Sequence, residues 1–560
     1  MIKRVLVRKG RYCDSAVLMR LSKAIGEIPG VAQATSWMGT PANAALLARS
    51  GYPQEELVQL TAVDLLVSLE LETNDALAGV DKELSRLLEP PPGKPGEEAR
   101  TPPRAVSIAL ALAERPEVNL VSVAVPGSYA AYVTERALEA GKHVFLFSNN
   151  VALEDELRLK RLGREKGLLV MGPDCGTSIL AGVGLGFANR VRRGRVGIVG
   201  ASGTGIQEIS SQIHALGEGI SQAIGIGGRD LSLQISGLMA ELALALLQAD
   251  PRTEVIVLVA KKPAAAVASR LASLLGDLGK PVVVRYLGET VAPSSSTSLT
   301  FTGSLLEAAR VAVGRIDGRP VQPLDPRRMA KKAGALLGRK KCLTGRLVGL
   351  FSGGSLALET AQLLGQAGVQ VRLAKEIVEP GPAFPGQGHL IVDTGDDGYT
   401  QGKPHPMVDQ TVRIALMQTA LRDPAVALLL IDVVLGDGAH PDPASELAAA
   451  LGEGQKARRA PVLAIASITG TELDPQDRSR QHKTLEEAGF QVMPSAAEAA
   501  LLAAALLKAP EKKPSTPARK PSTPARKPST PARKRGAAPV ASKARALRRA
   551  EGGTRQRRRR

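Results

Sequence analysis

Short apolar runs alternate with amphipathic stretches along most of the chain. In the first 89 residues, strands are expected at 2–7, 31–38 and 64–71, and helices at 14–28, 41–49 and 74–88. The alternation resumes after residue 104, and new series begin at RVGIVG (Arg195–Gly200) and RLVGLF (Arg346–Phe351). These later strands are apolar at consecutive positions, which is typical of strands covered by helices on both faces. The pattern predicts an α/β fold built on doubly wound parallel sheets.

Interruptions of this alternation divide the chain into four segments that are expected to fold. A small N-terminal α/β domain (1–89) is followed by a proline-rich linker (90–104) and by three further α/β domains (105–190, 191–318 and 340–508). Ligands of doubly wound sheets bind beyond the carboxyl ends of the strands. Candidate chemistry is therefore expected in the turns that follow strands.

Composition narrows the class of protein. Apolar residues make up 44% of the chain but aromatic residues only 2%, so the cores are expected to consist of Ala, Leu and Val. Cys13, Cys175 and Cys342 form neither a disulfide framework nor a close-spaced zinc site, and no metal is expected. No stretch of 18 apolar residues lacks a charge, and the first residues, MIKRVLVRKGRYCDS, contain no signal-peptide core. We expect a soluble, cytoplasmic protein without a membrane span.

The net charge of +19 at pH 7 is concentrated at the C-terminus. Residues 511–560 hold 18 Lys and Arg residues against two Glu, and they include three KPSTPAR repeats between Lys513 and Arg533. Frequent proline and a lack of apolar residues predict a disordered tail over 509–560. The tail is expected either to contact a polyanion, such as nucleic acid, anionic lipid or polyphosphate, or to be a solvated extension only.

Two glycine-rich turns follow apolar strands and precede helices. Ser202, Gly203 and Thr204 lie in the first, within VGIVGASGTGIQEIS, and Gly353, Gly354 and Ser355 lie in the second, within RLVGLFSGGSLALETA. Backbone N–H groups at a helix N-terminus, with hydroxyls beside them, form an anion site, so we expect these residues to bind phosphate. Because two such turns occur in consecutive α/β domains, we expect both helix N-termini to converge on one phosphate. The alternative for each is a tight turn that holds no ligand.

Two more strand ends carry candidate substrate- or cofactor-binding residues. Asp174 and Cys175 lie in GPDCGTS, and Gly227 and Gly228 lie in IGIGGRD. No base stands beside Cys175 in the sequence, which favours a structural thiol over a nucleophile. A plain turn is the alternative for the two glycines.

Two histidines lie in the most polar part of the sequence. His405 belongs to GDDGYTQGKPHPMVD, which follows the expected strand HLIVD, and His440 belongs to LGDGAHPDP, which follows LLIDVV. Imidazole and carboxylate groups after adjacent strands are suited to acid–base chemistry, so both histidines are catalytic candidates. A hydrated surface loop is the alternative.

The motifs together resemble a known family. GPDCGT, VGIVGASGTG and IGIGGRD, in this order, resemble the α subunit of succinyl-CoA synthetase. MGTPANAALL, GDDGYTQGKPHPMVD and VLGDGAHPDPA resemble the FdrA branch of that superfamily. The resemblance covers residues 1–508. It implies a CoA-binding-type Rossmann domain (105–190) followed by two flavodoxin-like domains (191–318 and 340–508), with CoA, an acyl phosphate or a nucleotide as ligand and with other subunits as partners.

The sequence departs from that superfamily at the phosphate relay. The ligases of the superfamily relay phosphate through a histidine, but the matching segment here, Thr290–Ala308, contains none, and the strand that should carry a supporting glutamate ends in Lys261 and Lys262. The resemblance to an oxamate carbamoyltransferase subunit then implies transfer of an acyl or carbamoyl group from a ready-made acyl phosphate, with Lys261 stabilising charge at the carbonyl. The alternatives are an acyl-CoA ligase subunit that works with a separate ATP-grasp partner, using His405 or His440, and a non-catalytic CoA- or nucleotide-binding protein.

Overall fold

The computed structural model describes residues 2–13, 15–88, 107–288, 298–400 and 404–508. The expected linker at 90–104, the expected tail at 509–560 and part of Thr290–Ala308 lie outside these residues. Within the described residues, no helix combines the length and the apolar character that a membrane crossing requires.

The N-terminal segment forms an antiparallel sheet with helices on both faces. Its strands are β1 (Ile2–Arg8), β2 (Val31–Met38) and β3 (Leu65–Leu71), in the order β1-β3-β2. Both outer strands run antiparallel to β3. Helices α1 (Ser15–Gly26) and α3 (Ala76–Leu88) contribute Leu21 and Val80 to the core on one face. Helix α2 (Pro41–Arg49) contributes Leu47 to the other.

The second segment forms a parallel sheet of three strands. Its elements are α4 (Ile108–Glu114), β4 (Leu120–Val123), α5 (Gly127–Glu139), β5 (His143–Leu146), α6 (Leu153–Lys166) and β6 (Val170–Met171). The hairpin of β7 (Thr177–Leu180) and β8 (Val183–Gly186), which the sequence pattern did not indicate, lies within residues 105–190 but pairs elsewhere. Its strand β7 runs antiparallel to β10 (Ile220–Gly225) of the next sheet. By strand pairing, β7 and β8 therefore belong to the sheet of the next segment.

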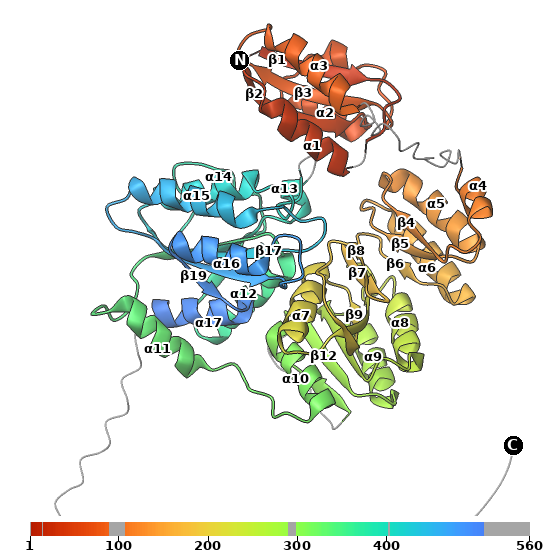
Figure 1. Cartoon of the computed structure of the whole chain (residues 1–560), viewed down its shortest axis with the longest axis vertical. Helices are drawn as coiled ribbons and strands as arrows, with labels where there is room; N and C mark the ends of the chain where they lie inside the picture. The colour runs from red at the N-terminus through yellow and green to blue at the C-terminus, as the bar shows by residue number, and fades with distance from the viewer. Residues whose placement is uncertain (1, 14, 89–106, 289–297, 401–403, 509–560) are drawn as a thin grey trace, which may run out of the picture. The chain divides into compact units, whose positions relative to one another are not determined.

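The third segment is a doubly wound sheet of seven strands in the order β13-β12-β11-β9-β10-β7-β8. The elements not yet given are β9 (Arg193–Gly200), α7 (Gly203–Ala215), α8 (Leu238–Ala249), β11 (Val255–Lys261), α9 (Ala265–Asp277), β12 (Val282–Leu287), β13 (Leu299–Phe301) and α10 (Leu305–Asp317). Helices α7 and α10 cover one face of the sheet, and α8 and α9 cover the other (Figure 1). Val257 and Val259 of β11 belong to the cluster with α7 and α10, whereas Leu258 belongs to the cluster with α8 and α9. This alternation explains why the strand is apolar at consecutive positions from Val255 to Ala260.

The fourth segment repeats this plan with six parallel strands in the order β15-β16-β14-β17-β18-β19. Its strands are β14 (Arg346–Phe351), β15 (Val371–Leu373), β16 (His389–Asp393), β17 (Val426–Val434), β18 (Leu463–Thr469) and β19 (Phe490–Met493). Its helices are α11 (Pro326–Leu337), α12 (Gly354–Gln366), α13 (Asp397–Thr400), α14 (Thr411–Arg422), α15 (Pro443–Lys456), α16 (Arg478–Glu487) and α17 (Ala496–Leu507). Parallel sheets confirm the predicted α/β class.

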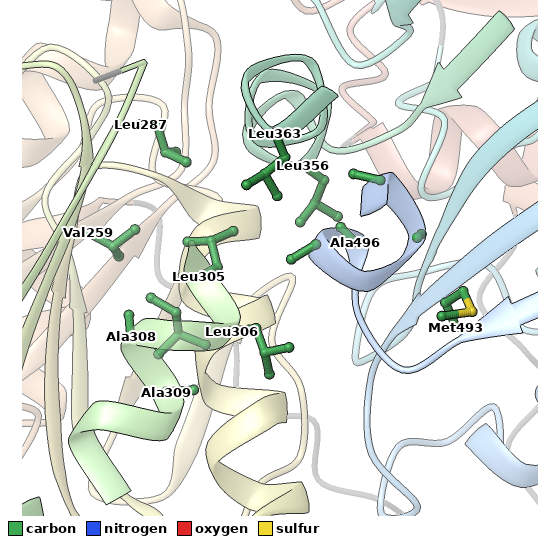
Figure 2. Close-up of a cluster of buried hydrophobic side chains, with 14 of the residues drawn as sticks. Val259, Leu287, Leu305, Leu306, Ala308, Ala309, Leu356, Leu363, Met493 and Ala496 are labelled. Atoms are coloured by element: carbon green, nitrogen blue, oxygen red, sulfur yellow. The ribbon is translucent and has the colours of Figure 1, made fainter. Parts of the chain in front are cut away.

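One buried apolar cluster joins the third and fourth segments. Leu305 and Leu306 of α10 lie beside Leu356 and Leu363 of α12 and Ala496 of α17 (Figure 2). Polar contacts cross the same joint: Thr469 Oγ1 on β18 donates to Glu208 Oε2 on α7 (2.5 Å), and the Leu305 amide on α10 donates to Glu359 Oε1 on α12 (2.6 Å). Burial of so much apolar surface fixes α7 and α12 with respect to each other.

Candidate functional site

The first glycine-rich turn caps helix α7. Ser202 is the N-cap residue in an extended conformation, and its hydroxyl accepts a hydrogen bond from the Gly205 amide at 3.0 Å. A Cβ at residue 205 would lie 2.4 Å from Ser202 Oγ, so the cap requires glycine there. Within the described residues, the amides of Gly203 and Thr204 have no hydrogen-bond acceptor. We call residues 200–205 the Ser202 loop.

The second turn begins helix α12 and is shaped by a buried ion pair. The Ser352 and Gly353 amides both donate to the Asp432 carboxylate, each at 2.8 Å. Arg413 holds that carboxylate at 2.6 Å, and both charged side chains are buried. The Asp432 carboxylate thus already accepts hydrogen bonds from two backbone amides of this turn, which are then not available to a ligand. The amides of Gly354 and Ser355 remain without an acceptor in the described part of the chain. We call residues 352–355 the Ser355 loop.

The two loops meet. Ser202 Oγ and Ser355 Oγ are 2.5 Å apart, and both residues are almost fully buried. The Ser355 loop also fits directly against the first helix, because a Cβ at Gly353 would lie 2.9 Å from Thr204 Cγ2. All six residues expected to bind phosphate are therefore in one place. Two helix N-termini bring partial positive charge to it.

A carboxyl group, Asp393, lies against the Ser355 loop, and the charge of Lys261 acts on it and on Asp174. Asp393 ends β16, and a Cβ at Gly354 would lie 2.4 Å from its Oδ2 atom. Burial, with the Gly395 amide opposing, raises the pKa of Asp393 to about 6. The Asp174 side chain is exposed to solvent, although protein atoms surround much of its carboxyl group. This desolvation, together with the negative charge of Asp397, raises the pKa of Asp174 to about 6. The positive charge of Lys261 lowers both pKa values, which places that exposed lysine within electrostatic reach of both carboxyl groups.

His405 lies beside the Ser355 loop, with its proton in a defined position. A Cβ at Gly395 would lie 2.6 Å from Ser352 O and 2.8 Å from His405 Nε2. The Met407 amide donates to His405 Nδ1 at 3.1 Å, so the neutral ring carries its proton on Nε2. Burial, reinforced by Arg413, lowers the pKa of His405 to about 4, and the ring is neutral at pH 7. The nitrogen nearest the loop is therefore a proton donor and not a free nucleophile.

His440 is held by its own turn. The Asp442 amide donates to Nδ1 at 3.0 Å, and Nε2 lies 3.2 Å from Glu446 Oε1. Both ring nitrogens are thus engaged at the start of α15, and no contact in the described chain joins the ring to either loop.

The other expected binding residues lie at the edge of the site. The Cys175 thiol is fully buried, which raises its pKa to about 11 and fits the structural role expected from the sequence. A Cβ at Gly227 would lie 2.6 Å from Pro173 O, so this glycine allows two loops to approach, whereas nothing crowds Gly228. Asp230 pairs with the buried Lys160 at 2.8 Å and accepts from the first amides of α8.

Asp393 and Arg413 were not among the residues singled out from the sequence. Asp393 is the last residue of a strand in a parallel sheet, a position that could have marked it as a candidate. Arg413 lies on α14, and nothing in its sequence neighbourhood signals that it reaches the Asp432 carboxylate.

Comparisons with known proteins agree with this architecture. A sequence model of the CoA binding domain matches residues 191–285, which include the Ser202 loop, and a model of the CoA-ligase family matches residues 350–506, which include the Ser355 loop. The CoA-binding type that we expected for residues 105–190 is not covered by these matches and stays a prediction. A model named "AllF, heavy metal-associated domain" matches residues 1–103.

The N-terminal residues do not fit a heavy-metal ion. Residues 1–103 contain one cysteine, the buried Cys13, and no histidine. Soft metal ions need several thiolate or imidazole ligands. Among the described residues, no three His, Cys, Asp or Glu side chains gather in a way that could hold a metal.

Two curated relatives and one solved structure are similar to this chain. The uncharacterized protein YahF of Escherichia coli K12 is 37% identical over 89% of this chain and 98% of its own length. Succinate–CoA ligase [ADP-forming] subunit alpha 2 of Archaeoglobus fulgidus is 30% identical over 39% of this chain and 74% of its own. A dinucleotide-forming acetyl-coenzyme A synthetase of Ca. Korarchaeum cryptofilum is 16% identical over 70% of this chain and 82% of its own, with a TM-score of 0.29, too low to support any argument.

The fold, the paired loops and the family matches define a CoA-ligase-type α/β protein, similar to the α subunit of succinyl-CoA synthetase and of the NDP-forming acyl-CoA ligase type. The extent of the match to YahF makes the assignment more specific. The chain belongs to the FdrA family of succinyl-CoA-synthetase-like proteins.

Proposed function

We propose that this protein transfers an acyl group between phosphate and an acceptor, with the phosphate held by the Ser202 and Ser355 loops, and that the group is a carbamoyl group. The observation that carries the proposal is the 2.5 Å contact between Ser202 Oγ and Ser355 Oγ. It brings together two helix N-termini that would otherwise be separate turns.

The loops offer the donors that a phosphoryl group needs. The amides of Gly203, Thr204, Gly354 and Ser355 lack acceptors among the described residues, and the hydroxyls of Ser202 and Ser355 lie beside them. Hydrogen bonds from fixed N–H and O–H groups to an anion are charge-assisted and strong. Because Asp432 already occupies the Ser352 and Gly353 amides, we assign the phosphate to the side of the loop where α12 begins.

The groups around the loops suit a carbamoyl group better than an alkyl acyl group. Asp174 and Asp393 can accept hydrogen bonds from the NH₂ of a carbamoyl group, which an alkyl chain cannot donate. Lys261, whose charge acts on both carboxyl groups, is suited to stabilise negative charge on the carbonyl oxygen.

The transfer needs no oxidant and no covalent enzyme intermediate. A phosphate oxygen forms a bond to the carbamoyl carbon, and the bond from that carbon to the acceptor nitrogen breaks. That nitrogen takes a proton, for which Asp393 is the proposed donor because its raised pKa leaves it partly protonated near neutral pH. In the reverse direction Asp393 accepts the proton. CoA and a further subunit remain proposed ligand and partner, on the strength of the matched CoA binding domain and of relatives named as subunits.

The second candidate is an acyl-CoA ligase subunit acting with a separate ATP-grasp partner. It is favoured by the relatives named as succinate–CoA ligase subunits and by the position of His405 beside the Ser355 loop. Against a phosphohistidine relay stands the proton on His405 Nε2, which would have to leave before that nitrogen could attack phosphorus.

Labelling separates the two functions. Full-length protein is incubated with ³²P-labelled carbamoyl phosphate, or with acyl-CoA and labelled phosphate, and is then tested for acid-labile, base-stable protein-bound label. The transferase proposal expects turnover without such label. Label on wild-type protein that His405→Gln removes and His440→Gln keeps would favour the ligase.

A further inference from the structure

A cavity of about 310 Å³ lies beside the C-terminal half of α7. Ser211, Gln212 and His214 of α7 line one side, and Glu472, Arg478 and His482 of the fourth segment line the other. Ser211 is eight residues beyond Gly203, about 12 Å along the helix at 1.5 Å per residue. The cavity is therefore separate from the paired loops, and its volume suits a small ligand.

The charges of the cavity favour an anion. Arg478 is the first residue of α16 and makes no hydrogen bond or ion pair with any described side chain, although it is partly buried. Glu472, the carboxylate in the lining, is already engaged by His214 Nε2 at 2.6 Å and by Arg192 at 3.7 Å. His482 follows Arg478 by four residues and so lies on the same face of α16. The lining carboxylate thus already has a hydrogen-bond donor and an ion-pair partner, and a guanidinium with five N–H donors is left to bind a ligand.

The cavity is linked to the joint between the two domains. Gln212 Nε2 donates to Glu208 Oε1 (3.2 Å) and to Pro494 O (2.7 Å), and Glu208 in turn accepts from Thr469 Oγ1. Burial raises the pKa of Glu208 to about 7, and the charge of Arg478 opposes that rise. The cavity therefore lies directly against α7, the helix that begins at the Ser202 loop.

We propose that this cavity is a second binding site, for a small organic anion bearing a carboxylate or phosphate group, with Arg478 as the residue that pairs with the charge. The inference does not depend on the proposed function. It rests on the cavity, on the Arg478 guanidinium that has no partner among the described side chains, and on the Glu472 carboxylate that already has partners.

Isothermal titration of the full chain with malonate, and separately with inorganic phosphate, tests the proposal and distinguishes carboxylate from phosphate ligands. Arg478→Gln removes the pairing charge, and Ala215→Trp fills the exposed edge of the cavity without altering charge. Lys483→Gln makes the same charge change on an exposed residue of α16 that does not line the cavity. Ser355→Ala reports on anion bound at the paired loops.

We expect wild type and Lys483→Gln to bind at least one of the two probes equally, and Arg478→Gln and Ala215→Trp to bind it about tenfold more weakly or worse. Ser355→Ala should lose affinity only for phosphate bound at the paired loops and should keep the binding that depends on Arg478. Equal binding by Arg478→Gln and Lys483→Gln would overturn the proposal, as would loss of all binding in Ser355→Ala or no binding of either probe by wild type. If the protein binds a probe through Arg478 but has no transferase activity, the second binding site is supported and the proposed function is wrong.

Discussion

Removing either hydroxyl of the Ser202–Ser355 pair is expected to weaken phosphate binding without a comparable loss of stability. A hydroxyl hydrogen bond to a charged group contributes about 1.5–3 kcal/mol, so Ser355→Ala should weaken binding about 10- to 100-fold. Ser355 is not the N-cap of α12, because Gly353 holds that position, and its loss should cost little unfolding free energy. Ser202→Ala should weaken binding equally and also cost about 1 kcal/mol of stability, because Ser202 caps α7 at 3.0 Å.

Titration calorimetry with inorganic phosphate, paired with urea unfolding, measures both effects. Ser495→Ala is the matched control, since Ser495 caps α17 through the Glu498 amide and lies outside both loops. It should reproduce the stability cost of Ser202→Ala and leave phosphate binding unchanged. The double variant should show a coupling of about 0.5–3 kcal/mol, because both hydroxyls serve one ligand. If Ser202→Ala and Ser355→Ala both bind phosphate as Ser495→Ala does, the assignment of phosphate to the paired loops is wrong.

Four further outcomes are expected. Asp393→Asn should remove an inflection near pH 6 from the rate profile of transfer to phosphate, in which activity falls as pH rises, and Asp174→Asn should leave that inflection in place. The raised pKa of Asp393 also means that its contribution to stability is present below about pH 4 and lost as pH rises through about 6, so Asp393→Asn should be more stable than wild type at about pH 8, by roughly 1–2 kcal/mol in urea unfolding. Cys175→Ser should change phosphate affinity less than about twofold, because the buried thiol has a pKa of about 11 and takes no part in binding; a larger loss in calorimetry would contradict this. Arg413→Met should lower the unfolding free energy by about 3–5 kcal/mol because it leaves the Asp432 carboxylate buried and unpaired, and adding Asp432→Asn should recover part of that loss; equal losses in the single and double variants would argue against the pair.

The architecture could be predicted where the hydrophobic pattern within one strand is set by the elements that cover that strand. Strand β11 is apolar at consecutive positions because neighbouring residues face helices on opposite sides of the sheet. The hairpin of β7 and β8 escaped prediction because its place depends on pairing with β10, about forty residues away, and its own sequence does not specify a partner.

The candidate site could be predicted in its parts but not in its assembly. Glycine and serine after an apolar strand indicated both loops, but their meeting depends on the apolar cluster between α10, α12 and α17. The sequence also could not show that Asp432 would take the first two amides of the Ser355 loop. The state of His405 depends on the Met407 amide and on burial, which only the folded chain defines.

A crystal structure of the full chain soaked with inorganic phosphate or carbamoyl phosphate tests the central claim most directly. The expected result is a phosphoryl group within hydrogen-bond distance of both Ser202 Oγ and Ser355 Oγ, with His405 unmodified and its Nδ1 still accepting from Met407. A phosphoryl group bonded to His405, or bound elsewhere with both serines unoccupied, would contradict it.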